Sequence, residues 1–82
     1  MLDVDDVKSV VSTLRQTRLR YGVSIRTAAS QLGISTGHYA RIENVQTVPS
    51  FDLAMKLCRF YRTQFELLFH EHILKTDPTY FL

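Results

Sequence analysis

The sequence predicts an all-α fold, with five short helices in one domain that spans residues 1–82. Apolar residues recur at spacings of three and four along most of the chain, which is typical of helices with one buried face. No segment alternates apolar and polar residues for long enough to indicate a strand. Serine, glycine and proline residues separate the periodic segments where helices commonly begin and end. A chain of 82 residues can build one hydrophobic core but not two.

The first helix is expected from about residue 4 to residue 21. Asp3 is a suitable N-cap, because its carboxylate can accept a hydrogen bond from a free backbone N–H group. Gly22 is a suitable stop, since glycine readily takes the left-handed conformation that ends many helices. One face of this helix is apolar and carries Val7, Val10, Val11, Leu14 and Tyr21.

Two short helices are expected next. Ser24 caps the second helix, which ends before Gly33, and Ser35 caps the third, which runs to about Asn44. The inward positions of this pair and its turn are Ile25, Ala28, Ala29, Leu32, Ile34, Tyr39 and Ile42.

After a loop over residues 45–50, Pro49 and Ser50 open a fourth helix that reaches about residue 61. Its inward residues are Leu53, Ala54, Leu57, Cys58 and Tyr61. Thr63 and Glu66 then have the spacing of a capping box, which predicts the start of a fifth helix. This helix carries Phe65, Leu68, Phe69 and Ile73, and Asp77-Pro78 ends it.

The stretch from Ser24 to Asn44 meets the requirements of a helix-turn-helix, in which two short helices cross steeply at a tight turn. Small residues are needed where the helices cross, and Ala28-Ala29 supplies them. The turn needs a residue that tolerates a positive φ, which is Gly33. An apolar residue must then fill the space between the helices, and Ile34 does so. An arbitrary pair of amphipathic helices would rarely meet all of these conditions.

Between Leu14 and Phe69 the chain closely resembles the Cro and lambdoid phage-repressor type of helix-turn-helix, also called the XRE family. The matching segments are Ala28-Ala29, Leu32-Gly33-Ile34-Ser35, Arg41-Ile42-Glu43-Asn44, Pro49-Ser50 and Phe65-Glu66-Leu67-Leu68-Phe69. The resemblance implies a five-helix, lambda-repressor-like DNA-binding domain that regulates transcription, with a repressor as the leading expectation. It also implies that the third helix lies in the major groove of a pseudo-palindromic operator.

The resemblance and the chemistry of the side chains together place the DNA contacts on and around the third helix. The expected contact residues are Arg26, Ser35, Thr36, Gly37, His38, Tyr39, Ala40, Arg41, Gln46 and Thr47. Arg41 is the best candidate to read a base, because a guanidinium can bind guanine O6 and N7 together. The alternative for His38 is ordinary solvent exposure, and for Arg41 it is a phosphate or solvent role. Ser35 is first a helix cap, and Tyr39 is expected to lie partly in the core with its hydroxyl at the DNA backbone. The resemblance further implies a structural ion pair between Arg18 and Glu43.

The chain departs from the family pattern at several positions. Ile25 stands where many members have a phosphate-binding glutamine, and Val45 stands where the family has glycine. The basic residues often found in the following loop are replaced by Gln46 and Thr47. We therefore expect phosphate contacts to come more from Arg26 and the first helix than from residues 45–50.

The charge distribution favours a polyanionic partner. No acidic residue occurs from position 7 to position 42, where six basic residues contribute +6, while residues 1–6 carry −3 and residues 43–82 carry −1. Such a split is expected of a protein that lays one side on double-stranded DNA. Two other functions stay open. The chain could be an antitoxin that also binds its own promoter, or a protein-interaction module that keeps the fold and has lost DNA binding.

Apolar residues are concentrated in the last part of the chain, which predicts a homodimer joined through residues 63–82. The expected interface residues are Phe65, Leu68, Phe69, Ile73, Tyr80 and Phe81.

Other functions are disfavoured by the sequence. His70 and His72 lie about 200° apart on a helix, so they cannot share a metal ion. Cys58 is the only cysteine and lacks a basic partner, so we expect no disulfide, no cofactor and no enzyme activity. We expect no signal peptide and no membrane span. The expected setting is the cytoplasm, where a bacterial or phage-encoded protein would associate with the nucleoid.

Overall fold

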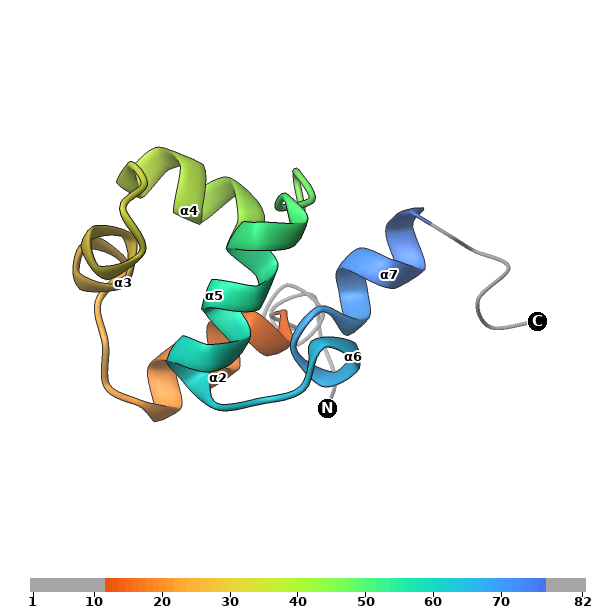
Figure 1. The fold of residues 1–82 in the computed structure, drawn as a ribbon, viewed down its shortest axis with the longest axis horizontal. Coiled ribbons are helices and arrows are strands. Elements are labelled where there is room, and N and C mark those ends of the chain that lie inside the picture. Colours follow the sequence, from red (N-terminus) through yellow and green to blue (C-terminus); the bar gives the residue numbers. More distant parts are fainter. Residues whose placement is uncertain (1–11, 77–82) are drawn as a thin grey trace, which may run out of the picture.

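A computed structural model of the protein describes residues 12–76, and within that range every regular element is a helix (Figure 1). The helices are α2 (Thr13–Arg20), α3 (Ile25–Leu32), α4 (Thr36–Glu43), α5 (Phe51–Tyr61), α6 (Phe65–Leu68) and α7 (His70–Thr76). The prediction of an all-α helix-turn-helix fold is confirmed. None of the described helices is long and apolar enough to cross a membrane.

Four of these helices begin in the same way, after a serine in extended conformation. The hydroxyl of each serine accepts a hydrogen bond from the backbone N–H group three residues later, at 3.0–3.2 Å. The pairs are Ser12 with Arg15, Ser24 with Thr27, Ser35 with His38, and Ser50 with Leu53. The predicted caps at Ser24, Ser35 and Ser50 are thus confirmed, since each satisfies one N–H group that the helix leaves free.

The prediction of one continuous first helix from residue 4 to residue 21 is wrong. Ser12 has φ −61° and ψ 155°, which is extended backbone, and α2 starts only at Thr13. The Ser12 hydroxyl both accepts from Arg15 N–H and donates to the carbonyl oxygen of Glu43, so a long-range contact fixes this residue outside the helix. The expected cap Asp3 and the apolar residues Val7, Val10 and Val11 lie outside the described residues.

The predicted fifth helix is divided in two, and its expected capping box is absent. Arg62 has φ 53° and ends α5, and the N–H of Thr63 bonds to the carbonyl of Cys58. Thr63 therefore belongs to the end of α5, and the N-cap of α6 is Gln64, whose side chain makes no capping bond. The chain bends again at Phe69, between α6 and α7. The expected stop at Asp77-Pro78 lies outside the described residues.

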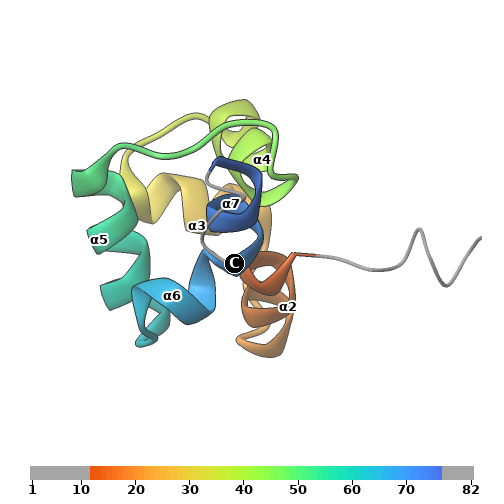
Figure 2. The same ribbon diagram turned by 90° about the vertical axis from the view of Figure 1, so that its right-hand side faces the viewer.

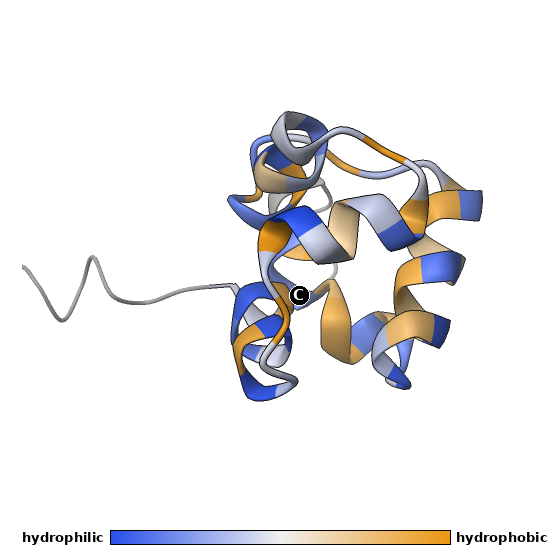
Figure 3. Ribbon diagram, turned by 90° about the vertical axis from the view of Figure 1, so that its left-hand side faces the viewer, coloured by the Kyte–Doolittle hydropathy of each residue, from blue (hydrophilic) through white to orange (hydrophobic). Residues whose placement is uncertain are grey.

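The core is formed by apolar residues of α2 to α6 and by Phe69, which follows α6; Figure 3 shows apolar and polar segments alternating along these helices. Its buried residues are Leu14, Ala28, Ala29, Leu32, Tyr39, Ile42, Leu53, Ala54, Leu57, Tyr61, Leu68 and Phe69. Helix α3 packs on α4 and α5, and α6 packs on α2 and α5. Viewed from the side, α7 lies between α2 and α4 (Figure 2).

Candidate nucleic-acid interface

The turn between α3 and α4 is built around Gly33. Gly33 has φ 74° and ψ 29°, a left-handed conformation that side chains disfavour. The N–H of Ile34 then donates to the carbonyl of Ala29 at 3.0 Å, which closes the end of α3. A Cβ on Gly33 would meet nothing within 4 Å, so backbone conformation and not space requires glycine here. Ala28 and Ala29 are buried where α4 crosses α3.

Helix α4 presents a small, polar and cationic surface to solvent. Thr36, Gly37 and Arg41 are exposed, as is the capping residue Ser35. His38 and Ala40 are half-buried. The side chain of Arg41 folds back along the helix, with Nη1 3.7 Å from the point that a Cβ on Gly37 would occupy. Gly37 thus leaves room for the Arg41 guanidinium to lie against the first turn of α4.

Tyr39, expected with its hydroxyl at the DNA backbone, lies in the core instead. Its side chain is completely buried, and its hydroxyl lies 2.7 Å from the hydroxyl of Tyr61 on α5. Burial raises the pKa of both phenols, so both hydroxyls stay protonated at neutral pH. Tyr39 therefore supports α4 from within and offers no surface to DNA.

The other expected contact residues lie on either side of α4 in the sequence. Arg26 is exposed in the first turn of α3, Gln46 is exposed in the loop after α4, and Thr47 is half-buried. This loop begins with Val45 at φ 60°, a left-handed conformation that is strained for a β-branched residue. The backbone N–H of Gln46 then donates to the Arg41 carbonyl at 2.8 Å.

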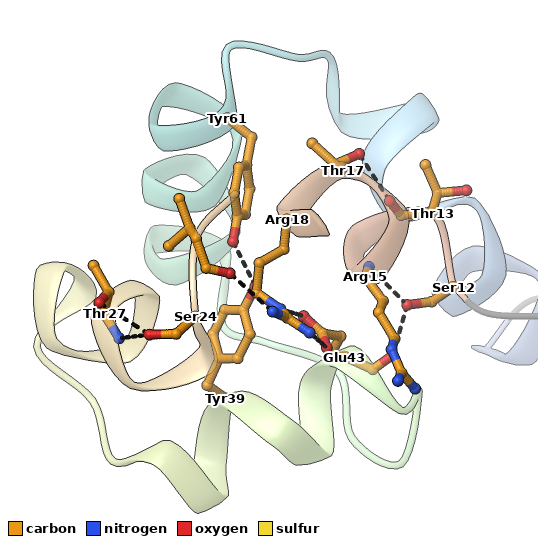
Figure 4. A network of polar contacts seen from close by, with 11 residues as sticks. Ser12, Thr13, Arg15, Thr17, Arg18, Ser24, Thr27, Tyr39, Glu43 and Tyr61 are labelled. Atoms are coloured by element: carbon orange, nitrogen blue, oxygen red, sulfur yellow. Dashed lines mark hydrogen bonds and ion pairs between the residues drawn. The ribbon is translucent and has the colours of Figure 1, made fainter. Parts of the chain in front are cut away.

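Arg18 and Glu43, the expected ion pair, join α2 to the last residue of α4 (Figure 4). Arg18 Nε donates to Glu43 Oε2 at 2.7 Å, and Nη2 donates to Oε1 at 3.0 Å. A third bond runs from Nη1 to the carbonyl of Val23 at 2.8 Å. The hydrogen bond to Glu43 raises the pKa of Arg18 further above its usual value. Because Glu43 is neutralised in this way, the only carboxylate of α4 adds no net negative charge to its surface.

Ser12 is a structural position beside the candidate interface that the sequence reasoning missed. Its hydroxyl donates to the carbonyl oxygen of Glu43 at 2.6 Å and so ties the start of α2 to the end of α4. The signal that could have revealed it is the repeated use of serine as an N-cap, which Ser24, Ser35 and Ser50 share.

Helix α7 provides two more polar contacts to the same region. His72 is buried, and its Nε2 hydrogen-bonds the carbonyl of Ile42 near the end of α4. Glu71 Oε2 accepts from the N–H and the hydroxyl of Thr13, at 3.1 and 2.9 Å. Helix α7 therefore holds the start of α2 and the end of α4 together.

Two observations concern the metal-binding and thiol side chains within residues 12–76. No three metal-binding side chains come together there. Burial raises the pKa of the half-buried Cys58 thiol, which makes its reactive thiolate scarcer at neutral pH.

The residues expected at a dimer interface separate into two groups. Leu68 and Phe69 are 0% and 1% exposed within the single chain, so they are core residues with no surface to offer a second copy. Phe65 is 40% exposed, and Ile73 is half-buried. Both line an apolar pocket of about 270 Å³, together with Val48, Pro49, Phe51, Ala54, Phe69 and His72. Tyr80 and Phe81 lie outside the described residues.

Comparison with known proteins gives one match. A family model described as a helix-turn-helix domain matches residues 10–68, well over half of the chain. Comparisons with curated proteins and with solved structures give no match.

Proposed function

The chain belongs to the helix-turn-helix domain family, and from this premise we propose that it is a sequence-specific DNA-binding regulator of the Cro and XRE type. In this proposal it acts as a transcriptional repressor on a pseudo-palindromic operator. Helix α4 lies in the major groove, where side chains can distinguish the four base pairs. The working unit is a homodimer, which matches the two-fold symmetry of such an operator.

The observation that carries the proposal is the surface of α4. Its exposed residues Thr36, Gly37 and Arg41 are small, polar or cationic, and the carboxylate of Glu43 is turned inward to Arg18. A protein-interaction module would have no need to hide its only acidic group on this helix. A surface that approaches phosphate groups does need this, because an unpaired carboxylate would repel them.

The side chains take different parts in this proposal. Arg41 reads a base edge, Thr36 and His38 contact bases or phosphates, and Gly37 lets the backbone come close to the groove. Arg26 and Ser35 contact phosphates at the starts of α3 and α4. Gln46 and Thr47 contribute weaker polar contacts from the loop after α4. Tyr39 has no contact, because it is buried.

The experiment that tests the proposal is selection of bound duplexes from a random-sequence pool, followed by affinity measurements over a range of salt concentrations. We expect a two-fold symmetric consensus. If about 6–8 phosphates are neutralised per dimer, log K should fall with log salt at a slope of about −5 to −7. Failure to enrich any sequence, together with no binding to any duplex at low salt, would refute the proposal.

A further inference from the structure

We propose that Arg15, on α2, binds a phosphate of the DNA backbone beside the C-terminal end of α4. This inference rests on the proposed function and adds to it a contact outside the helix-turn-helix itself. Its basis is a juxtaposition of three groups from distant parts of the chain: the Ser12 hydroxyl, the last turn of α4 and the exposed guanidinium of Arg15.

Arg15 is held in a defined place relative to α4. Its backbone N–H donates to the Ser12 hydroxyl at 3.1 Å, and that hydroxyl donates to the carbonyl oxygen of Glu43 at 2.6 Å. One oxygen atom therefore connects the backbone of Arg15 to the last residue of α4. Figure 4 shows the Arg15 side chain extending past Ser12 and Glu43 toward this end of the helix. The backbone that carries this cation is therefore fixed relative to the end of α4.

The charge of Arg15 is not compensated within residues 12–76. The carboxylate of Glu43 accepts two hydrogen bonds from Arg18. Arg18 and Glu43 form an ion pair, with Arg18 Nε 2.7 Å from Glu43 Oε2. The pair is neutral as a unit, and Glu71, the carboxylate at the start of α2, accepts its hydrogen bonds from Thr13 and not from Arg15.

A phosphate is the partner that suits this position best. Arg15 lies on α2 beside the end of α4, so it would reach the strand that borders the groove, whereas base edges are left to α4. The C-terminal end of a helix carries partial negative charge and would repel a nearby phosphate, so a phosphate at this place needs a cation beside it. The loop that follows α4 brings only the uncharged Gln46 and Thr47 to this end. Arg15 supplies the cation that this loop lacks.

The test compares Arg15→Gln with Arg20→Gln, which removes the same charge from the other end of α2. That end lies on the side of the molecule away from α4 (Figure 1). Affinity of the full chain for its selected duplex is measured from 50 to 200 mM salt, and melting temperatures are measured in parallel. For Arg15→Gln we expect the slope of log K against log salt to become less steep by about 0.9 per protomer. Between the lowest and the highest salt concentration, the variant should therefore lose less affinity than the unchanged protein, by a factor of about 3.5 per protomer. The Arg20→Gln slope should equal that of the unchanged protein.

Ethylation of individual phosphates in the duplex gives a second readout. Ethylation of one phosphate in each half-site should weaken binding of the unchanged protein. Ethylation of the same phosphate should have no effect on the binding of Arg15→Gln. Equal loss of slope in both variants would mean a general charge effect and would overturn the inference. A lower melting temperature with an unchanged slope would also overturn it, since Arg15 would then only stabilise the end of α4. Absence of DNA binding by the unchanged protein would instead refute the proposed function.

Discussion

Glu43 shows how a single residue serves the structure and the proposed interface together. A carboxylate at the end of a DNA-facing helix would repel phosphate groups, but this one is 3% exposed and is bonded to Arg18 on α2. Its main-chain carbonyl is bonded to Ser12, the N-cap of the same helix. Glu43 therefore fixes the angle between α2 and α4 and leaves the exposed side of α4 without negative charge.

Replacement of Glu43 should be costly for this reason. Glu43→Ala leaves the guanidinium of Arg18 buried without its partner, and we expect a loss of about 3–5 kcal/mol in the free energy of unfolding. The double variant Arg18→Met/Glu43→Leu removes both charges and should recover much of this loss. Urea or thermal denaturation followed by circular dichroism measures both values. A melting temperature of Glu43→Ala equal to that of the unchanged protein would show that the pair does not stabilise the fold.

Gly37 should affect stability and DNA affinity in opposite directions. Glycine destabilises a helix by roughly 0.5–1 kcal/mol relative to alanine, so Gly37→Ala should stabilise the protein by about that amount. The new methyl group would lie 3.7 Å from Arg41 Nη1 and at the surface that approaches the groove. We therefore expect weaker binding to the selected duplex despite the higher melting temperature. If affinity stays unchanged or rises with stability, close approach at this position is not needed.

Arg41 and Arg26 should differ in what their removal does to binding. Arg41→Ala should cost about 1–3 kcal/mol on the selected duplex and relax the preference at one base pair, with non-specific binding less affected. Arg26→Ala should weaken all sequences by a similar factor, because phosphate contacts carry no sequence information. Competition assays with single-base variants of the duplex separate the two profiles. If the profiles are exchanged, the base reader lies on α3.

At the scale of elements, the ends of α4 explain its fixed orientation. Its start is capped by Ser35, and the carbonyls of Ile42 and Glu43 near its end are bonded to His72 of α7 and to Ser12. Helix α7 is thus part of the support of the proposed recognition helix. Phe69, at the bend between α6 and α7, and His72 are both buried.

Local signals account for the elements that the sequence predicts well. The caps at Ser24, Ser35 and Ser50 and the turn at Gly33 depend on hydrogen bonds within a few residues, so their patterns can be recognised in the sequence. The start of α2 has the same serine cap, but the apolar spacing around it favoured a continuous helix. The apolar spacing of Val7, Val10 and Val11 continued into Leu14, while the partner of Ser12 lies 31 residues away.

The candidate site shows the same limit. Helical spacing predicted that Tyr39 points inward, but it does not reveal that the partner of its hydroxyl is Tyr61 on another helix, 22 residues later. The approach of Arg18 to Glu43 was expected only through the family resemblance. Leu68 and Phe69 were expected at an interface because the sequence does not reveal how much of this apolar segment the single chain can bury.

The end of α4 contains strain that can be removed. Val45 has φ 60°, and a non-glycine residue held in this conformation costs of order 1–3 kcal/mol. Val45→Gly removes this strain but makes the unfolded chain more flexible, so we expect a net gain of about 0.5–1.5 kcal/mol in stability. Denaturation midpoints measure the gain, and Val48→Gly in the same loop is the control, because Val48 has no positive φ. A loss of stability in Val45→Gly would show that packing of the valine side chain outweighs the strain.

At the scale of the whole molecule, the surface that remains for a second copy lies around the pocket between the start of α5 and helices α6 and α7. Its apolar residues include Val48, Phe51 and Phe65, which are 51%, 74% and 40% exposed. Apolar patches of this kind commonly mark protein interfaces. The proposed dimer would therefore use Phe65 and Ile73, as expected from the sequence, and would add Val48 and Phe51 from the segment after α4.

Dimerisation through this surface should depend on its exposed aromatic residues. Phe51→Glu and Phe65→Glu place a charge where apolar surface would be buried, and we expect each to shift the protein from dimer to monomer at micromolar concentration in sedimentation equilibrium. Phe69→Glu is unsuitable, because Phe69 is buried and its replacement would unfold the chain. Leu19→Glu is the matched control, since Leu19 is 56% exposed on α2 and does not line the pocket.

In a dimer the two α4 helices would enter successive major grooves about 34 Å apart, so the monomeric variants should bind a full operator with the weak affinity of a single half-site. Dimers that persist in both aromatic variants, or that dissociate equally with Leu19→Glu, would place the interface on another part of the molecule.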